Sequence, residues 1–467
     1  MSIAVEKRGI SRQVSPAVSE DLRQRPRDRV KHCRARIVCD GPHCENTDMS
    51  LVLRAEPRGF CPVQALRRNK SGKVFALPQS YRVERFEAAD RMDVTTEISP
   101  SEAGTILTVD LEAIVANWQT LQMVCGDAEC GAVVKADAYG LGLNPVVKAL
   151  YEAGCKTFFV AHPFEGRAVR AIAPLAAIYV LNGMRPNTAP LYADFNLIPV
   201  LCSVPEIEDF GQYCAVSKRR TREGGLLPAA FRLETGLNQL GLKPYDLEHG
   251  SHLSHLFDVR LIMTQLARAK HAAVITKQIE RFEAMRTIKY AHVPASIAHS
   301  GGIFLEANPL YDLVRPGYAL YGGNPVPGQP NPMKPVVRLE AQVIQVRILE
   351  PGERVGEDQS WVARGPRRIC TISAGFGDGI PRRLTKTKNG AGGFVISQGK
   401  RCPFIGGVSM DLAAVDTSDS GYVERGDIVE LIGPSITIDD FAAAAGISGY
   451  EALTQLGQRC HRRYQKL

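Results

Sequence analysis

Long apolar segments are missing from this sequence of 467 residues. No stretch is long and apolar enough to cross a lipid bilayer, which argues against a membrane-spanning protein. The chain reaches Lys7 and Arg8 soon after its start, with no apolar run behind them, so the pattern of a secretory signal is missing as well. We therefore expect a cytoplasmic protein with no membrane partner.

Metal-binding and disulfide patterns are also missing. The 12 cysteines include no CxxC pair, and the 10 histidines form neither an HExxH motif nor a His–Cys cluster. So few cysteines in so long a chain do not make a disulfide framework. We predict no metal site and interpret the cysteines as reduced thiols.

Only the N-terminal part carries an excess of one charge. Residues 1–91 hold 19 Lys or Arg against 11 Asp or Glu, whereas residues 92–467 hold 38 of each. A basic arm can attract nucleic acid or anionic lipid, but the short apolar pieces of this region rarely build a core. We interpret residues 1–91 as a basic, disordered extension, or as a gene-model artefact with the true start at Met92, and we expect no nucleic-acid partner.

The segment from about residue 105 to 325 alternates short apolar runs with amphipathic stretches. Eight runs are predicted as strands: 132–135, 157–160, 177–180, 197–200, 230–233, 259–262, 295–298 and 313–315. This alternation is typical of helices packed around a parallel sheet, and eight units predict a (β/α)8 barrel. The chemistry of such a barrel lies at the carboxyl ends of its strands.

The chain after about residue 330 loses this alternation. Its apolar runs, at 336–339, 341–346, 369–372, 393–396 and 428–432, are separated by Gly, Pro and charged turns, which is typical of antiparallel strands. Only residues 439–445, opened by two acidic side chains, have the pattern of a helix. The predicted fold is thus α/β, with a barrel over 92–330 followed by a mostly antiparallel β-domain over 331–467.

A lysine and a tyrosine stand at the end of the first predicted strand. Lys135 ends the strand and Tyr139 follows four positions later, so both are expected at the mouth of the barrel. A lysine in this place can form a Schiff base with a carbonyl compound. The alternative is an ion pair with Asp137 or another acid at the strand end, and on position alone this is the simpler interpretation.

Two further candidates follow the last predicted strands. Ser300 and the two glycines after it follow the seventh strand, where barrels often hold a phosphate, although a plain turn is the alternative. Arg315 ends the eighth strand, where the alternative is an ordinary surface ion pair.

Four motifs together resemble the signatures of alanine racemases. They are residues 134–140 around the lysine, 235–241 (Thr-Gly-Leu-Asn-Gln-Leu-Gly), 314–322 around Arg315, and 407–411 (Gly-Val-Ser-Met-Asp). Their order and spacing match the family from about residue 105 to the C-terminus. The resemblance implies an isomerase that interconverts L- and D-alanine with pyridoxal 5′-phosphate (PLP) as cofactor. It also implies a homodimer with shared active sites and a small amino acid as substrate.

The resemblance assigns roles to the residues that match its motifs. The cofactor-binding positions would be Lys135, Tyr139, Ser300, Arg315, Gly317 and Tyr318. Lys135 would be the aldimine lysine and one base, which in the family serves the D enantiomer. Arg315 would face the pyridine nitrogen and disfavour its protonation. Met410 and Asp411 would reach the substrate from the partner subunit's β-domain.

Racemisation needs a proton removed from one face of Cα and returned on the other. The departures from the family affect the residues that serve the face opposite Lys135. The family uses a tyrosine of the opposite subunit after a Val-Gly or Val-Ser pair, and here Glu357 follows Val355-Gly356. The histidine that supports this tyrosine is replaced by Gln265. Two further positions, usually an arginine and a lysine that is often carbamylated, are Gln239 and Arg232.

Retained PLP binding with altered proton chemistry is the interpretation that we favour. Glu357 is the candidate second base, although an ordinary carboxyl has a pKa of about 4.3 and a phenol one of about 10; a solvated loop residue is the alternative. Racemisation is the predicted reaction. The alternatives are another PLP-dependent reaction on a small amino acid, by decarboxylation or retro-aldol cleavage, and a non-catalytic PLP-binding homodimer.

Overall fold

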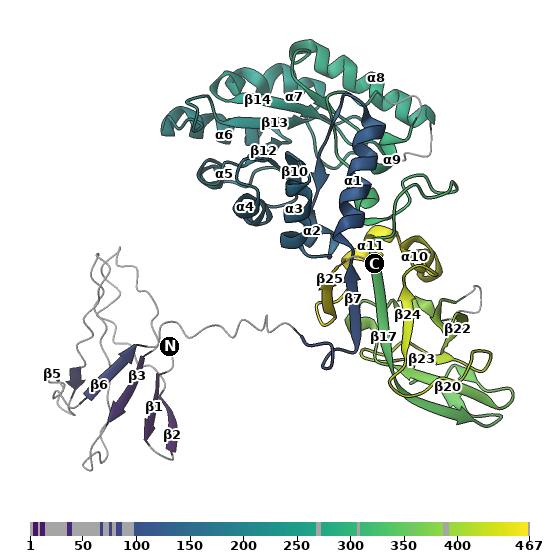
Figure 1. Ribbon diagram of the computed structural model, residues 1–467. Helices are drawn as coiled ribbons and strands as arrows, with labels where there is room; N and C mark the ends of the chain where they lie inside the picture. Colours follow the sequence, from purple (N-terminus) through teal and green to yellow (C-terminus); the bar gives the residue numbers. More distant parts are fainter. Residues whose placement is uncertain are drawn as a thin grey trace. The chain divides into compact units, whose positions relative to one another are not determined.

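The computed structural model describes residues 98–267, 272–305, 309–357, 359–385 and 392–465, and six short strands before them. The chain forms two units, residues 1–97 and 98–467 (Figure 1). The first contains three antiparallel pairs: β1 (Ile3–Lys7) with β2 (Ile10–Val14), β3 (Ala35–Cys39) with β6 (Tyr81–Arg85), and β4 (Leu66–Arg68) with β5 (Val74–Ala76). Most of the predicted extension lies outside the described residues, and its interpretation stays a prediction.

The second unit contains all eight predicted barrel strands. They are β9 (Ala132–Val133), β10 (Thr157–Val160), β11 (Ala177–Val180), β12 (Ile198–Leu201), β13 (Pro228–Arg232), β14 (Asp258–Met263), β15 (Ala295–Ser296) and β16 (Leu313–Val314). Strands β9 to β15 pair in sequence order, all parallel, and β16 pairs with β8 (Glu129–Cys130), just before β9. On its other side, the Arg315 N–H donates to the Ala298 carbonyl at 2.9 Å, which closes the ring. The predicted (β/α)8 barrel is confirmed.

Helices surround the parallel strands, as Figure 1 shows. They are α1 (Leu111–Cys125), α3 (Leu143–Glu152), α4 (Pro163–Ile172), α5 (Ala189–Asp194), α6 (Val204–Ser217), α7 (Pro244–His249), the 3-10 helix η2 (Gly250–Leu256), α8 (Ala272–Lys289), α9 (Ser300–Ile303) and the 3-10 helix η3 (Tyr318–Tyr321). In α1, the Asp110 side chain caps the first turn and Ile114 and Leu121 are buried. Strands β10 and β12 are buried at every position, because helices and the barrel interior cover both faces.

The long strand β17 (Val337–Leu349) organises the C-terminal domain. It pairs antiparallel with β20 (Arg367–Ile372) and with β24 (Ile428–Ile432). The remaining pairs run through β23 (Ala413–Asp416), β22 (Lys400–Ile405) and β21 (Phe394–Ser397), so that six strands form a closed antiparallel barrel. A separate pair, β18 (Arg354–Val355) and β19 (Trp361–Val362), extends from it. The predicted antiparallel β-domain is confirmed.

Both ends of the second unit join this β-domain. Strand β7 (Thr105–Val109) pairs with β17, and β25 (His461–Tyr464) pairs in parallel with β7 (Figure 1). A segment that precedes the (β/α)8 barrel is therefore part of the C-terminal sheet. Apolar patterning could not reveal this pairing, because it depends on contacts between segments that are distant in the sequence.

The β-domain contains more helical structure than we expected. The predicted helix is confirmed as α10 (Ile438–Ala445), whose cap residue Thr437 accepts a hydrogen bond from the Asp440 N–H at 3.1 Å. The expectation of a single helix was wrong, because α11 (Gly449–Thr454) follows it, and the 3-10 helices η4 (Phe376–Asp378) and η5 (Arg382–Leu384) precede it. Helix α11 buries only two side chains, so it has no apolar period that a sequence could reveal.

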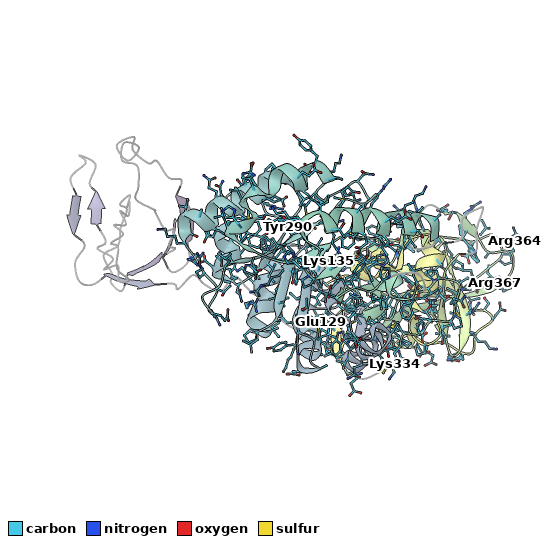
Figure 2. All side chains as sticks on the ribbon, turned by 90° about the horizontal axis from the view of Figure 1, so that it is seen from above. Glu129, Lys135, Tyr290, Lys334, Arg364 and Arg367 are labelled. Carbon is cyan, nitrogen blue, oxygen red and sulfur yellow. The ribbon has the colours of Figure 1, made fainter. Side chains whose placement is uncertain are left out.

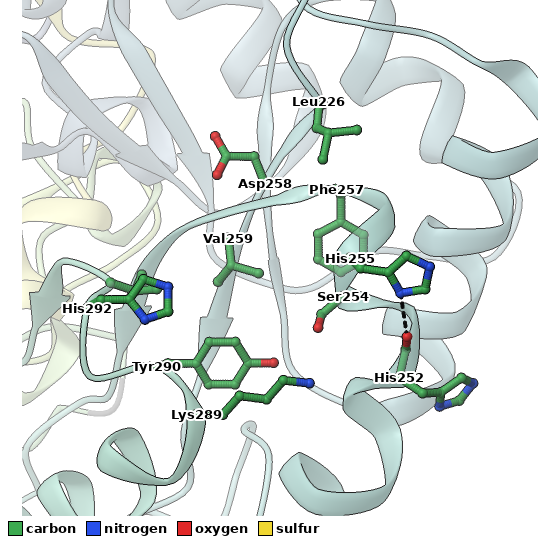
Figure 3. Close-up of a pocket in the computed structure, with 11 residues that line it drawn as sticks. Leu226, His252, Ser254, His255, Phe257, Asp258, Val259, Lys289, Tyr290 and His292 are labelled. Atoms are coloured by element: carbon green, nitrogen blue, oxygen red, sulfur yellow. Dashed lines mark hydrogen bonds between the residues drawn. The ribbon is translucent and has the colours of Figure 1, made fainter.

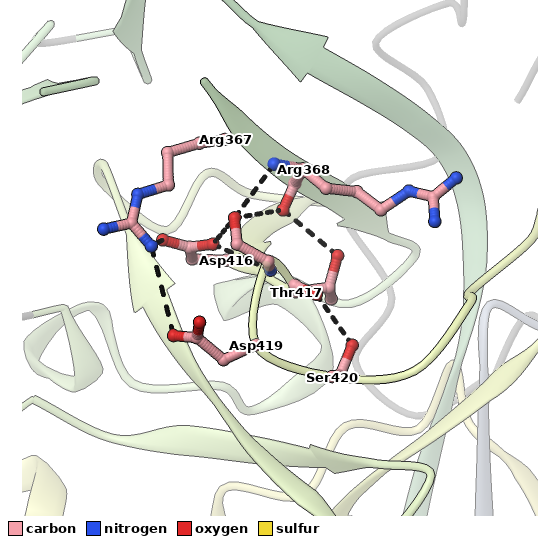
Figure 4. A network of polar contacts seen from close by, with 7 residues as sticks. Arg367, Arg368, Asp416, Thr417, Asp419 and Ser420 are labelled. Carbon is pink, nitrogen blue, oxygen red and sulfur yellow. Dashed lines mark hydrogen bonds and ion pairs between the residues drawn. The ribbon is translucent and has the colours of Figure 1, made fainter. Parts of the chain in front are cut away.

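Polar contacts hold β20 against the turn after β23 (Figure 4). The Thr417 N–H donates to the Arg368 carbonyl at 2.9 Å, and the Arg368 N–H donates to the Ser418 hydroxyl at 2.9 Å. Arg367 forms an ion pair with Asp416 at 3.6 Å. This end of the β-domain lies far from Lys135 (Figure 2). Among the described residues, no helix has the length and hydropathy needed to span a bilayer.

Candidate active site

A cavity of about 560 Å³ opens at the carboxyl ends of the barrel strands. The residues that line it come from the turns after these strands and from α11, and include Lys135, Tyr139, Arg232, Gln265, His299, Ser300, Arg315, Gly317, Tyr318 and Tyr450. The structure therefore brings all six predicted cofactor positions to one cavity. This is the end of the barrel at which barrel enzymes carry their chemistry.

The chain turns sharply after Lys135. Residues 136–139 all have left-handed backbone angles, with φ between 53° and 58°, and none of them is glycine. Each costs about 1–2 kcal/mol relative to the right-handed form. Glu165 holds the turn, because one of its oxygens accepts the Ala136 N–H at 2.7 Å and the other accepts the N–H of His162 at 2.9 Å. The turn brings Lys135 and Tyr139 to the same cavity.

Lys135 is held in a form suited to nucleophilic and base chemistry. The Asp137 carboxylate accepts the Leu143 N–H at 2.7 Å, and Lys135 forms no ion pair with any carboxylate of the described residues, so the alternative of an ion pair was wrong. Burial lowers the pKa of Lys135; the charge of Glu165 opposes this effect and that of Arg232 adds to it. A lowered pKa increases the fraction of neutral amine.

One wall of the cavity has the donors that a phosphate requires. The Ser300 hydroxyl lies 3.0 Å from the Gly317 nitrogen and 3.2 Å from the Ala319 nitrogen, whose N–H groups donate to it. A Cβ at Gly317 would collide with the Tyr139 hydroxyl, so a larger residue there would displace the Tyr139 ring. Tyr139 is a buried residue that lines the cavity, and its hydroxyl has no hydrogen-bond partner among the described residues. Burial raises the pKa of Tyr139, which keeps the hydroxyl a donor. These groups fit the phosphate of PLP.

Tyr450 is a residue of this wall that the sequence reasoning missed. Its ring stacks on Tyr318 with centroids 4.4 Å apart and lies 5.9 Å from the ring of Tyr139. The Tyr318 hydroxyl donates to Asp439 at 2.8 Å, so this side chain has a structural role. Ser448, which accepts the Glu451 N–H at 3.2 Å, is the one sequence signal that could have marked this short helix.

Arg315 and His299 form the floor of the cavity. The Arg315 guanidinium is buried and donates to the Ser296 hydroxyl and the Thr264 carbonyl, so the alternative of a surface ion pair was wrong. Burial and the charge of Arg232 lower the pKa of Arg315 to about 9, which leaves it charged at neutral pH. Burial, with the charge of Arg315, lowers the pKa of His299 to about 4, so this ring is neutral there.

The three residues predicted for the other half of the site lie elsewhere. Glu357 is exposed on the β-domain and accepts a hydrogen bond from the Ser409 hydroxyl at 3.2 Å. Met410 is 56% exposed, and Asp411 forms an ion pair with Arg459 at 2.6 Å. None of the three lines the cavity of its own chain. Gln265 does line it, whereas Gln239 is exposed outside it.

A second cavity of about 510 Å³ lies at the opposite, amino ends of β13, β14 and β15 (Figure 3). Its lining includes His252, His255, Lys289, Tyr290 and His292. Among the described residues, no group of three His, Cys, Asp or Glu could hold a metal ion. The amino ends of barrel strands serve stability rather than catalysis, so we place the candidate active site in the first cavity.

Known protein families match nearly all of the second unit. Residues 109–325 match the model of the alanine racemase N-terminal domain, and residues 336–464 match that of the C-terminal domain. An alanine racemase of Methylobacterium nodulans is 44% identical over 371 residues, covering 78% of this chain and 97% of the relative. A catabolic alanine racemase of Mesorhizobium japonicum is 41% identical over 375 residues, covering 79% and 95%.

Solved structures match over the same share of the chain. The crystal structure of alanine racemase from Bartonella henselae with covalently bound pyridoxal phosphate is 37% identical, with a TM-score of 0.72 and coverage of 78% of this chain and 99% of that one. The biosynthetic alanine racemase from Pseudomonas aeruginosa is 32% identical, with a TM-score of 0.70 and coverage of 78% and 99%.

Proposed function

The chain belongs to the alanine racemase family of PLP-dependent isomerases, and we propose on this premise that it interconverts L- and D-alanine as a homodimer. The observation that carries the proposal is the meeting of all six predicted cofactor positions in one cavity at the carboxyl ends of the barrel strands. The roles of individual residues below are part of the same proposal.

Different residues around the cavity would hold different parts of the cofactor. Lys135 would hold PLP covalently, and the hydroxyls of Tyr139 and Ser300 with the backbone of Gly317 and Tyr318 would hold its phosphate. PLP, when bound, supplies an electron sink for the charge that develops at Cα when the α-proton leaves. Both hydroxyls belong to buried residues, so water would compete little for the phosphate oxygens.

Lys135 would move the proton on one face of Cα. Its Nζ has a lowered pKa, so the amine can take the α-proton when neutral and return it when charged. Arg315 would set the character of the cofactor, because a guanidinium that stays charged opposes a second positive charge on the pyridine nitrogen. The cofactor would then be a weaker electron sink, which favours proton transfer at Cα and limits side reactions.

The other face of Cα would be served by a second copy of the chain. Glu357, the candidate second base, and Met410 lie on an exposed surface of the β-domain, where Phe376 and Leu412 are also 42% and 40% exposed. Exposed apolar side chains gathered in one place mark an interaction surface. A homodimer would bury them and bring Glu357, Met410 and Asp411 to the partner's cavity.

We also propose a cytoplasmic location. The described residues contain eight buried cysteines that form no disulfide, which agrees with a reducing compartment. Fractionation of the cells that produce the protein would test this.

Chiral analysis of products tests the function directly. Purified protein loaded with PLP is incubated with L-alanine, D-alanine and a panel of other amino acids, and we expect the opposite enantiomer of alanine to accumulate. The mass in solution should be that of a dimer. Release of CO₂ or of an aldehyde without racemisation would favour the decarboxylase or retro-aldol alternative, and bound PLP without any turnover would favour a non-catalytic dimer.

A further inference from the structure

A second buried arginine lines the candidate active site. Arg232 ends β13 and is 9% exposed, and its guanidinium has neither a hydrogen bond nor an ion pair with any residue that the structure describes. Arg315 is equally buried, but its guanidinium donates to Ser296 and Thr264. The two arginines therefore differ. The guanidinium of Arg315 is hydrogen-bonded to the protein, whereas that of Arg232 lines the cavity without a partner among the described residues.

The carboxylate whose charge acts on Arg232 is engaged elsewhere. Glu234 attracts Arg232 electrostatically, but its two oxygens accept the N–H groups of Gly236 and, at 2.8 Å, of Asn238. Glu234 thus stabilises the loop that follows β13. Gln239, on the same loop, is exposed and carries no charge. No carboxylate of the described residues forms an ion pair with Arg232.

A buried cation without a partner is unfavourable unless a ligand supplies the opposite charge. A guanidinium suits a carboxylate in particular, because two parallel N–H groups can bind its two oxygens. The phosphate of PLP would have its own donors in the hydroxyls of Tyr139 and Ser300, on another wall of the cavity. The remaining anion that an amino-acid substrate brings to this cavity is its α-carboxylate.

The position of Arg232 in the barrel suits this role. It ends the fifth of eight strands, across the mouth from Lys135, which follows the first. The two side chains share the cavity, and the charge of Arg232 lowers the pKa of Lys135, which places it within electrostatic reach of the amine. A carboxylate bound by Arg232 would keep the α-carbon between the two groups.

We propose that Arg232 binds the α-carboxylate of the amino-acid substrate, and that it thereby selects free amino acids over their amides and esters. The inference rests on the proposed function, since it takes an amino acid as the substrate. Arg232 would be the residue that recognises this substrate within the same site.

Ligand binding tests the inference without turnover. Propionate and propionamide are titrated calorimetrically into the protein with and without PLP, for the wild type, Arg232→Gln, Arg232→Lys and the control Arg260→Gln. Arg260 is an exposed arginine paired with Asp258 at 2.8 Å on the outside of the cavity. We expect the wild type and the control to prefer propionate by at least about tenfold, Arg232→Gln to lose this preference and Arg232→Lys to keep part of it.

Kinetics and stability provide two further readouts. Arg232→Gln should raise the KM for alanine at least tenfold and change kcat less, while α-proton exchange of alaninamide stays at its wild-type rate. Its melting temperature without ligand should be no lower than that of the wild type, because an unpaired buried charge is removed. If Arg232→Gln does not fold, the propionate preference of Arg232→Lys must still fall below that of the wild type.

Three results would contradict the proposals in different ways. An undiminished preference for propionate in Arg232→Gln would overturn the role of Arg232. Weaker PLP binding with that preference intact would place Arg232 in the cofactor site and overturn the role as well. A protein that takes up no PLP would contradict the proposed function, and the titration without PLP would still decide whether Arg232 binds a carboxylate.

Discussion

The proposed cofactor half of the candidate active site and its proposed second half, which would carry a proton, are built in different ways. Tyr139 and Arg315 are buried and Lys135 is half-buried at the strand ends of one barrel, and their positions follow from the packing of a single chain. Glu357 and Met410 are exposed on the β-domain and line no cavity of their own chain. The differences from the family's motifs at Glu357 and Gln265 belong to the second half. Both of these residues are exposed, and an exposed residue can change with little cost to folding.

Removing the lysine should have the largest effect, because it would disable the cofactor half. We expect Lys135→Ala to lose covalent attachment of PLP and at least about 10³-fold of turnover. Borohydride reduction followed by peptide mapping would show PLP on Lys135 in the wild type. Lys148→Ala, which alters an exposed lysine on α3, is the matched control and should retain the label. A label at any other lysine in the wild type would refute the assignment.

Proton exchange compares the two halves directly. Lys135 lies at the cavity with a lowered pKa, whereas the tyrosine and histidine of the family are replaced by Glu357 and Gln265. D-alanine should therefore exchange its α-proton with deuterated water about 10²-fold faster than L-alanine. The paired change Glu357→Tyr with Gln265→His should accelerate the slow enantiomer more than either change alone, as NMR can measure.

Rapid and equal exchange from both enantiomers in the wild type would be incompatible with this asymmetry. Glu357 would then be a competent second base, or another residue would carry the proton. The single variant Glu357→Ala separates these outcomes, since it would slow one enantiomer only if Glu357 is the base.

Mixing two inactive variants tests whether the halves come from different chains. Lys135→Ala lacks the cofactor half, and Glu357→Ala with Met410→Ala lacks the second half. If the two are refolded together, half of the dimers should be mixed and each of these should have one intact site, so that about a quarter of the wild-type activity returns. A monomeric mass in solution with full activity, or a mixture no more active than its parts, would exclude a shared site.

The half-buried histidine of the candidate active site should make stability depend on pH. The folded protein holds His299 with a pKa of about 4, below the ordinary value of about 6.5. Between these values only the unfolded chain takes up the proton, so the free energy of unfolding should fall by up to about 3 kcal/mol as the pH drops from 6.5 to 4. His299→Gln should remove this part of the slope in urea titrations, whereas His255→Gln, at an exposed position, should leave it unchanged. An identical slope in His299→Gln would contradict the assignment.

Deleting residues 1–91 should have the smallest effect. The candidate active site lies entirely within the second unit, and the two family models begin only at residue 109. A chain that starts at Met92 should therefore bind PLP and unfold at the same urea concentration as the full chain. Aggregation of the shorter chain under conditions that keep the full one in solution would show that these residues contribute to the fold.

Apolar runs were sufficient to locate the barrel, because strands buried on both faces must be apolar along their whole length. All eight predicted strands overlap β9 to β16. The sheet partner of β7 was not predictable, because it depends on contacts between distant segments, and the short helix α11 has only the cap residue Ser448 as a local signal. Tyr450 was missed for the same reason, since α11 alone brings it to the wall of Tyr139.

The sequence motifs were enough to predict which groups meet in the candidate active-site cavity, because a motif at the end of a barrel strand has a defined place in the fold. How these groups are paired follows only from the folded chain. In it, Arg315 is satisfied by Ser296 and Thr264, whereas Arg232, at the end of another strand, has no partner among the described residues. The physical reason is that the burial and pairing of a charge depend on side chains from several strands, and these become neighbours only when the barrel closes.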